Sequence, residues 1–597
     1  MASDDGAGKR WKAEPVSGPI DDSTAWGSDI AAQMLRRLGI PFIALTPGAS
    51  YRGLHDSLIN HLGNTCPEIL LCLHEEHAVA LAHGYAKATG RAMAVALHSN
   101  VGLMHGTMAI FNAWADRAPM LILGATGPMD ATRRRPWIDW LHTAQDQAAL
   151  VRSFVKWDDQ PGAPAAIPES MLRGWKLTNT QPMAPVYINL DAGDQEAPLA
   201  APVTFPDPGR FEPPAPPRAV AGQLAQAARL LSETRRPVLL FGRGTRTEQA
   251  MDARVALAER LGAAMLSDLK AGAMVPTDHP LHAGQPFNKL SAVGREVLSQ
   301  ADLILSLGWI DLGGLLQQAF GDTAPAARII HAGQDHHLHR GWGHEHFALP
   351  ALDVELLCDP DAAVADLLAA LPEAPPRKAD LPRPTAGKPG NSDALTLRDV
   401  AIALKSAVGD TPVTFAALAR GWPVDLWPHR APLDYLGKDG GGGVGSGPGL
   451  TIGAALALRD SGRMTVGVLG DGDTMMSINA LWTAAKYRIP ALFVVSNNRS
   501  YFNDELHQEN VARQRGRSEA NAWIGQRIDD PAPDFAALAR AQGVDATGSV
   551  RTADELAGAI ADAIAAIRSG RPYLVDVLID ARQGRETSTV RKTKVGD

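Results

Sequence analysis

Two short polar motifs follow two apolar runs in the C-terminal third of the chain. Gly470-Asp471-Gly472 comes directly after MTVGVL, and Asn497-Asn498 comes directly after ALFVVS. Such runs predict parallel strands, whose carboxyl ends form the edge at which open α/β sheets bind ligands. The glycines would let the backbone approach a ligand, and a helix beginning after them would present free amides to an anion. Asp471 and Asn498 supply carboxylate and amide oxygens, which Mg²⁺ prefers alongside phosphate oxygens.

These motifs predict a site for a magnesium–diphosphate headgroup. The structural alternative is that the first motif is a turn and the second a loop, and that neither binds a ligand. A Rossmann dinucleotide site is the weaker interpretation, because the third glycine of G-x-G-x-x-G would fall on Met475.

A candidate proton-transfer group lies in HEEHAVALAHGYAKATG, residues 74–90. An apolar run precedes Glu75 and a helical pattern follows it, so this carboxyl is expected to be partly buried. The alternative is an acidic first helical turn, which the helix dipole favours without any catalytic role. A zinc site of the HExxH type is excluded, because its second histidine would fall on Ala78.

The two C-terminal motifs, separated by residues 473–496, resemble the signature of thiamine diphosphate enzymes. SINALWTAAKYRIPALFVVSNNRSY is similar to the benzoylformate decarboxylase branch of that family, which also includes 2-keto acid decarboxylases, acetolactate synthases and carboligases. The resemblance implies thiamine diphosphate and Mg²⁺ as cofactors. It implies Asp471, Asn498 and the backbone carbonyl of Ser500 as metal ligands, and Gly470, Gly472 and Asn497 as further cofactor-binding positions.

One position departs from the family pattern. The residue after GDG is usually a small hydroxyl residue that contacts the diphosphate, but here it is Asp473. A carboxylate repels a diphosphate unless it turns away, so Asp473 is expected either to weaken cofactor binding or to cap a helix N-terminus.

The resemblance also assigns residues to the pyrimidine end of the cofactor. The spacing from Glu75 to Gly84-Tyr85 is similar to the family's Glu…GYA pattern, which selects Glu75 over Glu76 as the carboxyl on the aminopyrimidine nitrogen. In DGGGGVGSGPGLTIGAA, the implied pyrimidine contacts are the carbonyl of Gly442 and the side chain of Val444, which bends the cofactor. A flexible glycine loop is the alternative.

Substrate-site candidates follow from the same resemblance. LHSNVGLMHGTMAIFNAWADRAP is similar to the benzoylformate decarboxylase segment that carries an active-site histidine, which places His98 at a strand end facing the cofactor. An imidazole can exchange protons with the intermediates. Ser50, Gln145 and His507 are further candidates. Two features of benzoylformate decarboxylases are missing here. The position after the PG pair, where that branch has a serine, holds Ala49, and no histidine follows LILSLGWIDLGGLLQQ. The resemblance therefore does not predict specificity for aryl keto acids.

The function that this resemblance implies is a thiamine diphosphate- and Mg²⁺-dependent C–C bond lyase or ligase acting on a 2-keto acid. Decarboxylation to an aldehyde, as in benzoylformate decarboxylase, and carboligation, as in acetolactate synthase, stay open. FAD stays possible but unsupported, because LLFGRGTR is only a weak GxG signal. The family further implies a homodimer or homotetramer with active sites between subunits. A flavin or nicotinamide oxidoreductase and a non-catalytic cofactor-binding homologue are the alternatives of another class.

Three α/β domains must position these residues. Proline-rich segments at residues 196–217 and 371–391 cannot form helices or central strands and are expected to be linkers. They predict an N-terminal arm (1–22), a pyrimidine-binding domain (23–195), a central Rossmann-like domain (218–370) and a diphosphate-binding domain (392–597). In each, apolar runs such as AMAVALHSN, ADLILSLGW and PALFVVSNN alternate with helical patterns, which predicts three doubly wound parallel sheets.

Composition narrows the class of protein. The 597 residues are 45% hydrophobic and 20% charged, as expected for a chain that buries large cores, and the net charge of -8 argues against a nucleic-acid partner. Three cysteines without a CxxC pair argue against a disulfide framework or an iron–sulfur site and favour a reducing cytosol. Neither a membrane span nor a signal peptide is recognised, so a cytoplasmic enzyme is expected.

Overall fold

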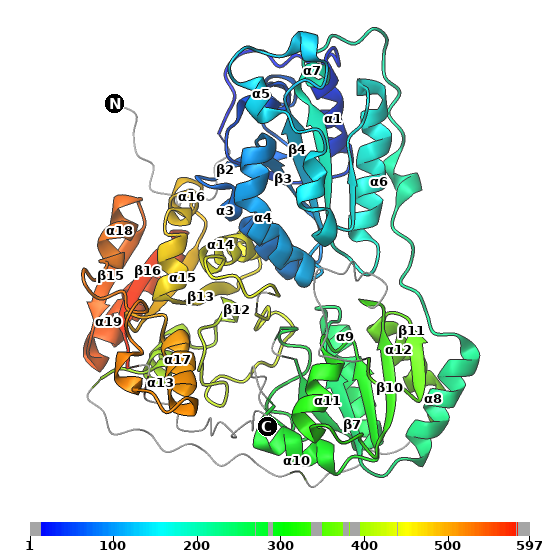
Figure 1. Ribbon diagram of the computed structural model, residues 1–597, viewed down its shortest axis with the longest axis vertical. Helices are drawn as coiled ribbons and strands as arrows, with labels where there is room; N and C mark the ends of the chain where they lie inside the picture. The colour runs from blue at the N-terminus through cyan, green and yellow to red at the C-terminus, as the bar shows by residue number, and fades with distance from the viewer. Residues whose placement is uncertain are drawn as a thin grey trace.

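The computed structural model describes residues 14–268, 270–284, 290–335, 349–373, 381, 394–438, 440–580 and 582. Each of three regions contains a parallel sheet with helices against it (Figure 1). The expected α/β fold with three parallel sheets is thereby confirmed. The first sheet has six strands in the order β2-β1-β3-β4-β6-β5, the second five in the order β11-β10-β9-β7-β8, and the third five in the order β12-β13-β14-β16-β15.

The strands begin and end as follows. The first sheet contains β1 (Phe42–Leu45), β2 (Glu68–Leu71), β3 (Met93–Leu97), β4 (Met120–Thr126), β5 (Trp157–Asp159) and β6 (Pro185–Asp191). The second contains β7 (Pro237–Phe241), β8 (Ala264–Ser267), β9 (Leu303–Leu307), β10 (Arg328–Gly333) and β11 (Val354–Leu357). The third contains β12 (Val413–Ala417), β13 (Met464–Gly470), β14 (Ala491–Asn497), β15 (Asp545–Val550) and β16 (Tyr573–Leu578).

Helices connect the strands within each region. The first region has α1 (Gly27–Arg37), α2 (Arg52–Asp56), α3 (Glu75–Thr89), α4 (Ser99–Ala115), α5 (Asp139–His142), α6 (Ile167–Asn179) and α7 (Ala192–Gln195). The second has α8 (Ala221–Glu233), α9 (Glu248–Leu261), α10 (Ala292–Ser299), α11 (Leu312–Phe320) and α12 (Pro360–Ala370). The third has α13 (Leu397–Val408), α14 (Gly447–Leu458), α15 (Asp471–Met476), α16 (Ala480–Lys486), α17 (Phe502–Gln514), α18 (Phe535–Ala541) and α19 (Ala553–Arg568).

The apolar runs are explained by burial on both faces of each sheet. Along β3, Met93, Val95 and Leu97 pack into one core, whereas Ala94 and Ala96 pack into the core on the opposite face. A strand covered on both sides favours apolar side chains at nearly every position, so its sequence is a nearly continuous apolar run instead of an alternating one. The same apolar pattern allows β13 and β14 to be predicted from the sequence.

One helix differs from its sequence-based prediction. A single helix was expected after GDG, but α15 ends at Met476 and α16 begins at Ala480. Ser477 between them leaves helical geometry, at φ -133° and ψ 31°. Its hydroxyl donates to the carbonyl of Asp473 at 3.4 Å, a local bond of the kind that competes with a regular helix.

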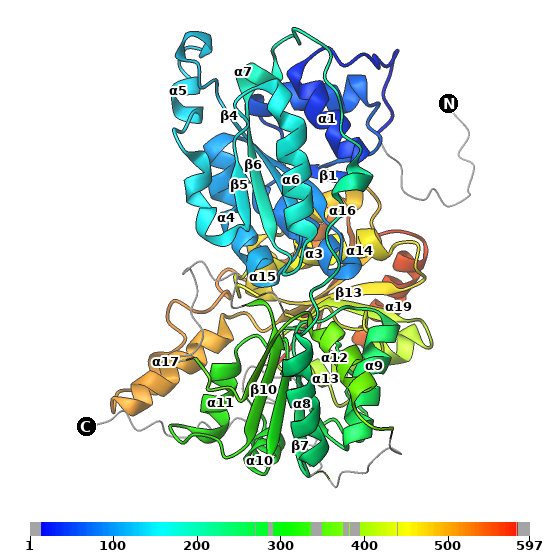
Figure 2. The same cartoon turned by 90° about the vertical axis from the view of Figure 1, so that its right-hand side faces the viewer.

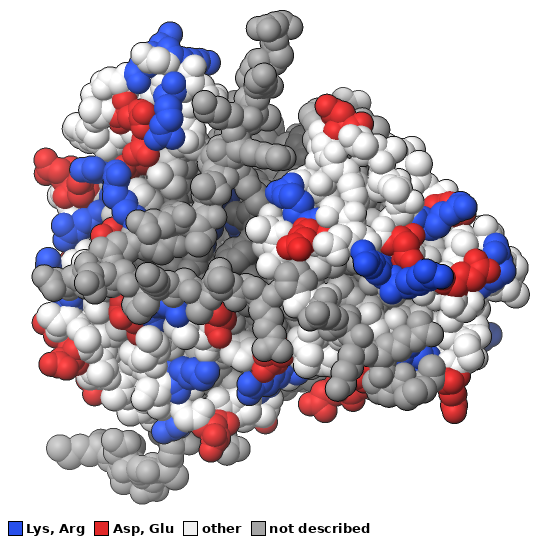
Figure 3. Space-filling view, turned by 90° about the horizontal axis from the view of Figure 1, so that it is seen from below, with Lys and Arg blue, Asp and Glu red and all other residues white. Residues whose placement is uncertain are grey.

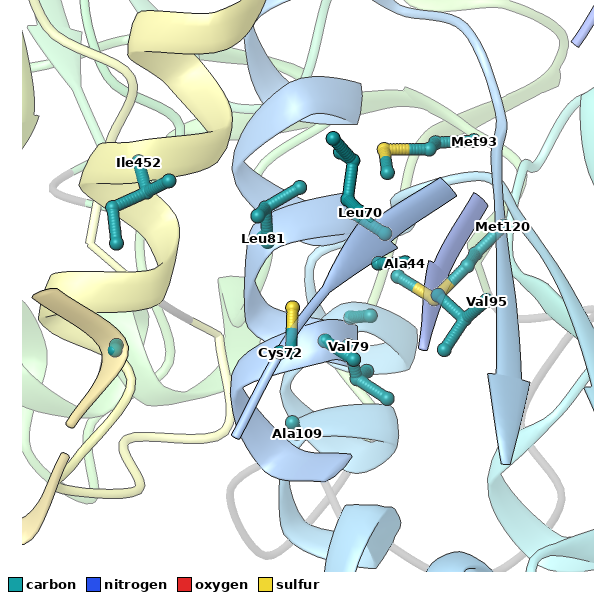
Figure 4. Packing of buried hydrophobic residues seen from close by; sticks show 14 of the residues in the cluster. Ala44, Leu70, Cys72, Val79, Leu81, Met93, Val95, Ala109, Met120 and Ile452 are labelled. Atoms are coloured by element: carbon teal, nitrogen blue, oxygen red, sulfur yellow. The ribbon is translucent and has the colours of Figure 1, made fainter. Parts of the chain in front are cut away.

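The first and third regions meet along α3 and α14. Figure 4 shows Ile452 of α14 directed toward Leu81 of α3, and both belong to one buried core. A Cβ on Gly84 would lie 2.1 Å from the carbonyl oxygen of Leu450, and one on Gly453 would lie 1.8 Å from that of Leu81. The two helices therefore cross at backbone contact, which only glycine permits at these two positions.

Further contacts connect the regions, which the view in Figure 2 shows stacked along the long axis. The carboxylate of Asp335 pairs with Arg117 of the first region at 2.6 Å and with Arg243 of the second at 2.5 Å. Lys87 of α3 donates to the carbonyl of Gly437 at 3.0 Å. These bonds fix the edge of α3 and α4 against both neighbouring regions.

The predicted linkers are only partly described. Residues 196–217 contain one short 3-10 turn, Pro208–Phe211, and otherwise no helix or strand apart from a bridge between Pro198 and Trp26. The second predicted linker, residues 371–391, lies almost entirely outside the described residues, as does most of the N-terminal arm. None of the helices that the structure describes has the length and apolarity needed to cross a bilayer. On the face seen in Figure 3, basic and acidic side chains are interspersed.

Candidate active site

The predicted metal ligands come together at the carboxyl ends of β13 and β14. The Ser500 amide donates both to Asp471 Oδ2 at 3.1 Å and to Asn498 Oδ1 at 2.9 Å. The turn that aims this amide passes through Arg499, whose φ of 57° lies in the left-handed region. The second oxygen of Asp471 accepts from the Gly472 amide at 2.8 Å. Two hard oxygen atoms, one from Asp471 and one from Asn498, therefore face the same amide.

This donor set fits a divalent cation. The side chain of Asp471 is buried, and this burial raises the pKa of its carboxyl above the ordinary value. Among the described residues, no lysine or arginine forms an ion pair with it. A buried carboxylate whose partners are amides is stabilised when a metal ion supplies the missing positive charge.

Asn497 and Gly472, which neighbour the predicted metal ligands, shape the turns that carry them. Asn497 donates from Nδ2 to Asp576 Oδ1 of β16 at 2.9 Å and accepts from the Arg499 amide at 3.1 Å, so its polar atoms fix the turn. Gly472 lies under the Tyr501 ring, where a Cβ would come within 2.5 Å of a ring carbon. A Cβ on Gly470 would meet nothing within 4 Å.

Asp473 caps a helix, but not the one to which it belongs. Its Oδ1 accepts from the Gly445 amide at 2.7 Å and from the Gly447 amide at 3.4 Å, at the N-terminus of α14. A carboxylate is favoured there by the helix dipole and by the unpaired first amides. The charge of Asp473 thus occupies amides that could otherwise bind an anion.

The glycine-rich loop lies along α4 of the first region. Cβ atoms on Gly440, Gly441 and Gly443 would come within 2.4, 2.1 and 2.4 Å of Asp116, Asn112 and Met108, respectively. The glycines are therefore required by the close approach of the loop to α4. Gly442 has a φ of +68°, and Val444 is 44% exposed.

Glu75 begins α3, and its side chain is only 10% exposed. Its Oε2 lies 3.0 Å from Nδ1 of His105, on α4. Its Oε1 lies against Gly102, where a Cβ would come within 3.2 Å. His74, the residue before Glu75, accepts from the Glu76 amide at 3.1 Å and stacks on the His105 ring with centroids 4.9 Å apart.

His98 follows β3 and is held by Ser50. The Ser50 hydroxyl accepts from the Ser99 amide at 3.1 Å and lies 2.9 Å from Nδ1 of His98, to which the Ser50 amide also donates at 3.4 Å. The Ser50 hydroxyl proton therefore points to Nδ1, and the ring carries its own proton on Nε2. Burial, reinforced by His142, lowers the pKa of His98 to about 4, so the imidazole is a neutral donor at pH 7.

The two halves of the site approach each other at Gly445. A Cβ on Gly445 would lie 3.3 Å from Met476 of α15 and 3.9 Å from Glu76 of α3. Within the chain, α3 and α14 pack together. The expectation that active sites form between subunits stays a prediction.

Two substrate candidates lie elsewhere. Gln145 is exposed and lines a surface hollow with Met129, Arg133, Asp191 and Asp194. His507 is exposed on α17, and no described hydrogen bond or ring contact joins it to the other candidates. Ser50 is the substrate candidate that the structure brings to His98.

Sequence reasoning missed two histidines. His105 pairs with Glu75, and the ring of His142, at the end of α5, lies edge-on to His98 with centroids 4.7 Å apart. A weak signal exists for His105, because it lies two helical turns beyond His98. His142 comes from an irregular segment, where no periodicity indicates direction.

Comparisons with known proteins agree with the fold and identify the family. Three family models match: the thiamine pyrophosphate enzyme N-terminal binding domain at residues 25–150, the central domain at 224–360 and the C-terminal binding domain at 416–577. The chain therefore belongs to the thiamine pyrophosphate enzymes and is a thiamine diphosphate-dependent enzyme, which confirms the resemblance.

Within that family, the relatives are decarboxylases and acetolactate synthases. The chain is 29% identical to a benzoylformate decarboxylase of Pseudomonas aeruginosa, over 85% of this chain and 91% of the relative. It is 25% identical to a probable acetolactate synthase large subunit of Methanocaldococcus jannaschii, over 95% and 96%.

Solved structures share the fold. A benzoylformate decarboxylase from Polynucleobacter necessarius superposes with a TM-score of 0.77 at 19% identity, covering 93% of this chain and 98% of the other. A 4-hydroxybenzoylformate decarboxylase from Rhodococcus jostii gives 0.74 at 21%, covering 93% and 99%.

Proposed function

We propose that this enzyme is a Mg²⁺-dependent C–C bond lyase acting on a 2-keto acid, with decarboxylation to an aldehyde as the main reaction. The observation that carries the proposal is the pair of hard oxygen atoms of Asp471 and Asn498, which face the same amide at the ends of β13 and β14. The enclosed carboxyl of Glu75 begins α3, which packs against α14, the helix whose N-terminus is capped by the Asp473 carboxylate.

The residues divide the work between binding and proton transfer. Thiamine diphosphate, when bound, supplies the nucleophilic carbon that adds to the keto carbon and the ring that accepts the electron pair left by carbon dioxide. Asp471, Asn498 and the carbonyl of Ser500 would hold Mg²⁺ and through it the diphosphate. Glu75 would hold a proton at the aminopyrimidine nitrogen. His98, with its proton on Nε2, would donate a hydrogen bond to the substrate oxygen.

A carboligase of the acetolactate synthase type is the second candidate. The relatives of that type match almost the whole chain, at 95% coverage for one of them. In this case the carbon left after loss of carbon dioxide bonds to a second carbonyl compound instead of taking up a proton. The residues named above keep their roles.

We also propose a homo-oligomer, at least a dimer. Trp137, which precedes α5, and Trp140, within α5, are 77% and 70% exposed, an arrangement typical of surfaces that another protein covers. Sedimentation of the holoenzyme tests this proposal, and a monomer at micromolar concentration would exclude it.

A keto-acid panel tests the reaction. Aryl and aliphatic 2-keto acids are incubated with Mg²⁺ and thiamine diphosphate, and carbon dioxide and products are measured for wild type and Glu75→Gln. We expect carbon dioxide release that falls by about 10²-fold or more in the variant, because a positioned proton donor typically contributes that much. Glu169→Gln, at an exposed ion pair of α6, is the matched control and should leave the rate unchanged.

Cofactor binding is measured separately by calorimetry. Asp471→Ala is expected to abolish Mg²⁺-dependent binding of thiamine diphosphate, whereas Asp460→Ala, at an exposed site of the same region, should not. Full affinity in Asp471→Ala would remove the ligand assignment. Cofactor binding without release of carbon dioxide from any keto acid would favour a non-catalytic homologue, and hydride transfer with a visible flavin spectrum would favour an oxidoreductase.

A further inference from the structure

The side chain of Glu75 is largely enclosed. Its side chain is 10% exposed, and Oε1 faces Gly102 of α4. Its other oxygen, Oε2, lies 3.0 Å from Nδ1 of His105, whose side chain is 60% exposed. The imidazole therefore connects an enclosed carboxyl with solvent.

The helix geometry explains why these groups meet. Gly102 and His105 are three residues apart on α4, so they lie on the same face of the helix. Gly102 removes the side chain that would otherwise occupy the place of Glu75, and His105 covers the carboxyl one turn later. Stacking on His74, with ring planes 18° apart, fixes the orientation of the His105 ring.

We propose that His105 is the proton carrier of Glu75, moving protons between solvent and the enclosed carboxyl. This inference rests on the proposed role of Glu75. Decarboxylation of a 2-keto acid to an aldehyde takes up one proton in each turnover, and a carrier beside the carboxyl can supply that proton from solvent. His105 is assigned no contact with substrate.

The step balances within the pair. Neutral His105 donates its Nδ1 proton to Oε2 of Glu75, and Nε2 takes one proton from solvent, so the ring stays neutral while the carboxylate becomes a carboxylic acid. The reverse sequence returns the proton to water. Each half of the step uses an existing 3.0 Å contact and the exposed side of the ring.

The charged and titratable neighbours do not compete for this role. Burial lowers the pKa of His74 below its usual value and that of His77 to about 4, so both stay neutral around pH 7. The pKa of Tyr51 is raised by burial and by the charge of Glu75, so its phenol keeps its proton. Burial also raises the pKa of Glu76, on the same helix turn.

Three variants separate proton transfer from positioning. Asparagine can donate to Glu75 but cannot titrate, and alanine does neither, so His105→Asn and His105→Ala are compared with Val101→Ala, an exposed position of the same helix. We expect kcat to fall by about 10²-fold in both histidine variants, because proton transfer by a positioned side chain contributes at least that much, and to stay unchanged in Val101→Ala. Added imidazole should restore the kcat of His105→Ala in a concentration-dependent way.

The opposite results are equally clear. Wild-type turnover in His105→Asn would reduce His105 to a positioning residue and overturn the proposal, as would failure of imidazole to restore a folded His105→Ala protein that still binds the cofactor. The ligand atoms of His74, Glu75 and His105 all lie within 4.8 Å of one another, a cluster that zinc could bind. The protein is therefore treated with chelator and assayed with Mg²⁺ alone.

A measurement without cofactor tests the pair independently of turnover. The Nδ1–H signal of His105, assigned by its loss in His105→Asn, is followed by NMR in wild type and Glu75→Gln. We expect this proton to exchange with water faster in Glu75→Gln, because the charged acceptor that holds it at 3.0 Å is lost. An unchanged signal overturns the pairing. A changed signal in a protein that decarboxylates no keto acid retains the pair and rejects the proposed function.

Discussion

At the scale of single residues, Asp473 is the clearest departure from the family pattern. Its carboxylate accepts from the amides of Gly445 and Gly447 and so places a negative charge at the N-terminus of α14. That charge stabilises the helix but lies one residue beyond the predicted diphosphate-binding glycines. Helix stability and cofactor affinity are therefore expected to oppose each other at this position.

Replacement of this carboxylate tests the opposition. In Asp473→Ser, the affinity for Mg²⁺–thiamine diphosphate should rise by about tenfold, because a repulsion of roughly 1 kcal/mol or more is removed at the anion site. The free energy of unfolding should fall by about 1 kcal/mol, since a cap is lost. Calorimetric titration and urea unfolding measure the two changes. A lower cofactor affinity together with lower stability would show that the carboxylate organises the site instead of repelling the ligand.

Local spacing made some residues of the site predictable and left others hidden. Asp471 and Asn498 each follow a strand directly, so the position of each side chain depends on a few neighbouring residues. His105 and His142 reach Glu75 and His98 only because α4 and α5 pack beside them, and no local pattern carries that information. The target of Asp473 was hidden for the same reason, because α14 approaches it from earlier in the chain.

At the scale of elements, the crossing of α3 and α14 positions both halves of the site. Glu75 begins α3. Gly447 begins α14, and its amide and that of Gly445, just before the helix, donate to Asp473. Strands were the best-predicted elements, because burial on both faces leaves a continuous apolar run. Helix ends were predicted less well, as the break between α15 and α16 shows, since such breaks depend on individual side-chain bonds.

A single added methyl group should separate these helices. In Gly84→Ala, the new Cβ would meet the Leu450 carbonyl at 2.1 Å, so the free energy of unfolding should fall by about 1–3 kcal/mol, as in other overpacked cores. Cofactor affinity should fall as well, because the two halves move apart. Gly558→Ala in α19 is the control: a Cβ there meets nothing within 4 Å, and alanine favours a helix by up to about 1 kcal/mol. Equal effects of the two substitutions on urea unfolding would contradict the close crossing.

At the scale of the whole molecule, neutral imidazoles are buried in all three regions. Burial lowers the pKa of His77 in the first region, His282 in the second and His429 in the third to about 4. His429 also joins two regions, because its amide donates to Thr277 at 2.9 Å and its carbonyl accepts from the Thr277 amide at 3.0 Å. These buried imidazoles make the stability of all three regions sensitive to acid, because burial disfavours their charged form.

The direction of this sensitivity follows from the pKa shifts. Between about pH 6.5 and pH 4, these histidines bind protons in the unfolded chain but stay neutral in the folded protein. The free energy of unfolding therefore falls as the pH falls through this window. One pH unit below 6.5, each histidine should cost roughly 1 kcal/mol. His429→Phe should reduce the dependence of the free energy of unfolding on pH by the contribution of one histidine, without loss of stability at pH 7.5. The reasons are that neither ring nitrogen of His429 has a hydrogen-bond partner among the described residues and that the ring stacks on Tyr435 with centroids 5.3 Å apart. Urea unfolding at pH 7.5, 6.5 and 5.5 measures the slope, with His507→Phe as the exposed control. An unchanged slope in His429→Phe would mean that this histidine takes up its proton in the folded protein.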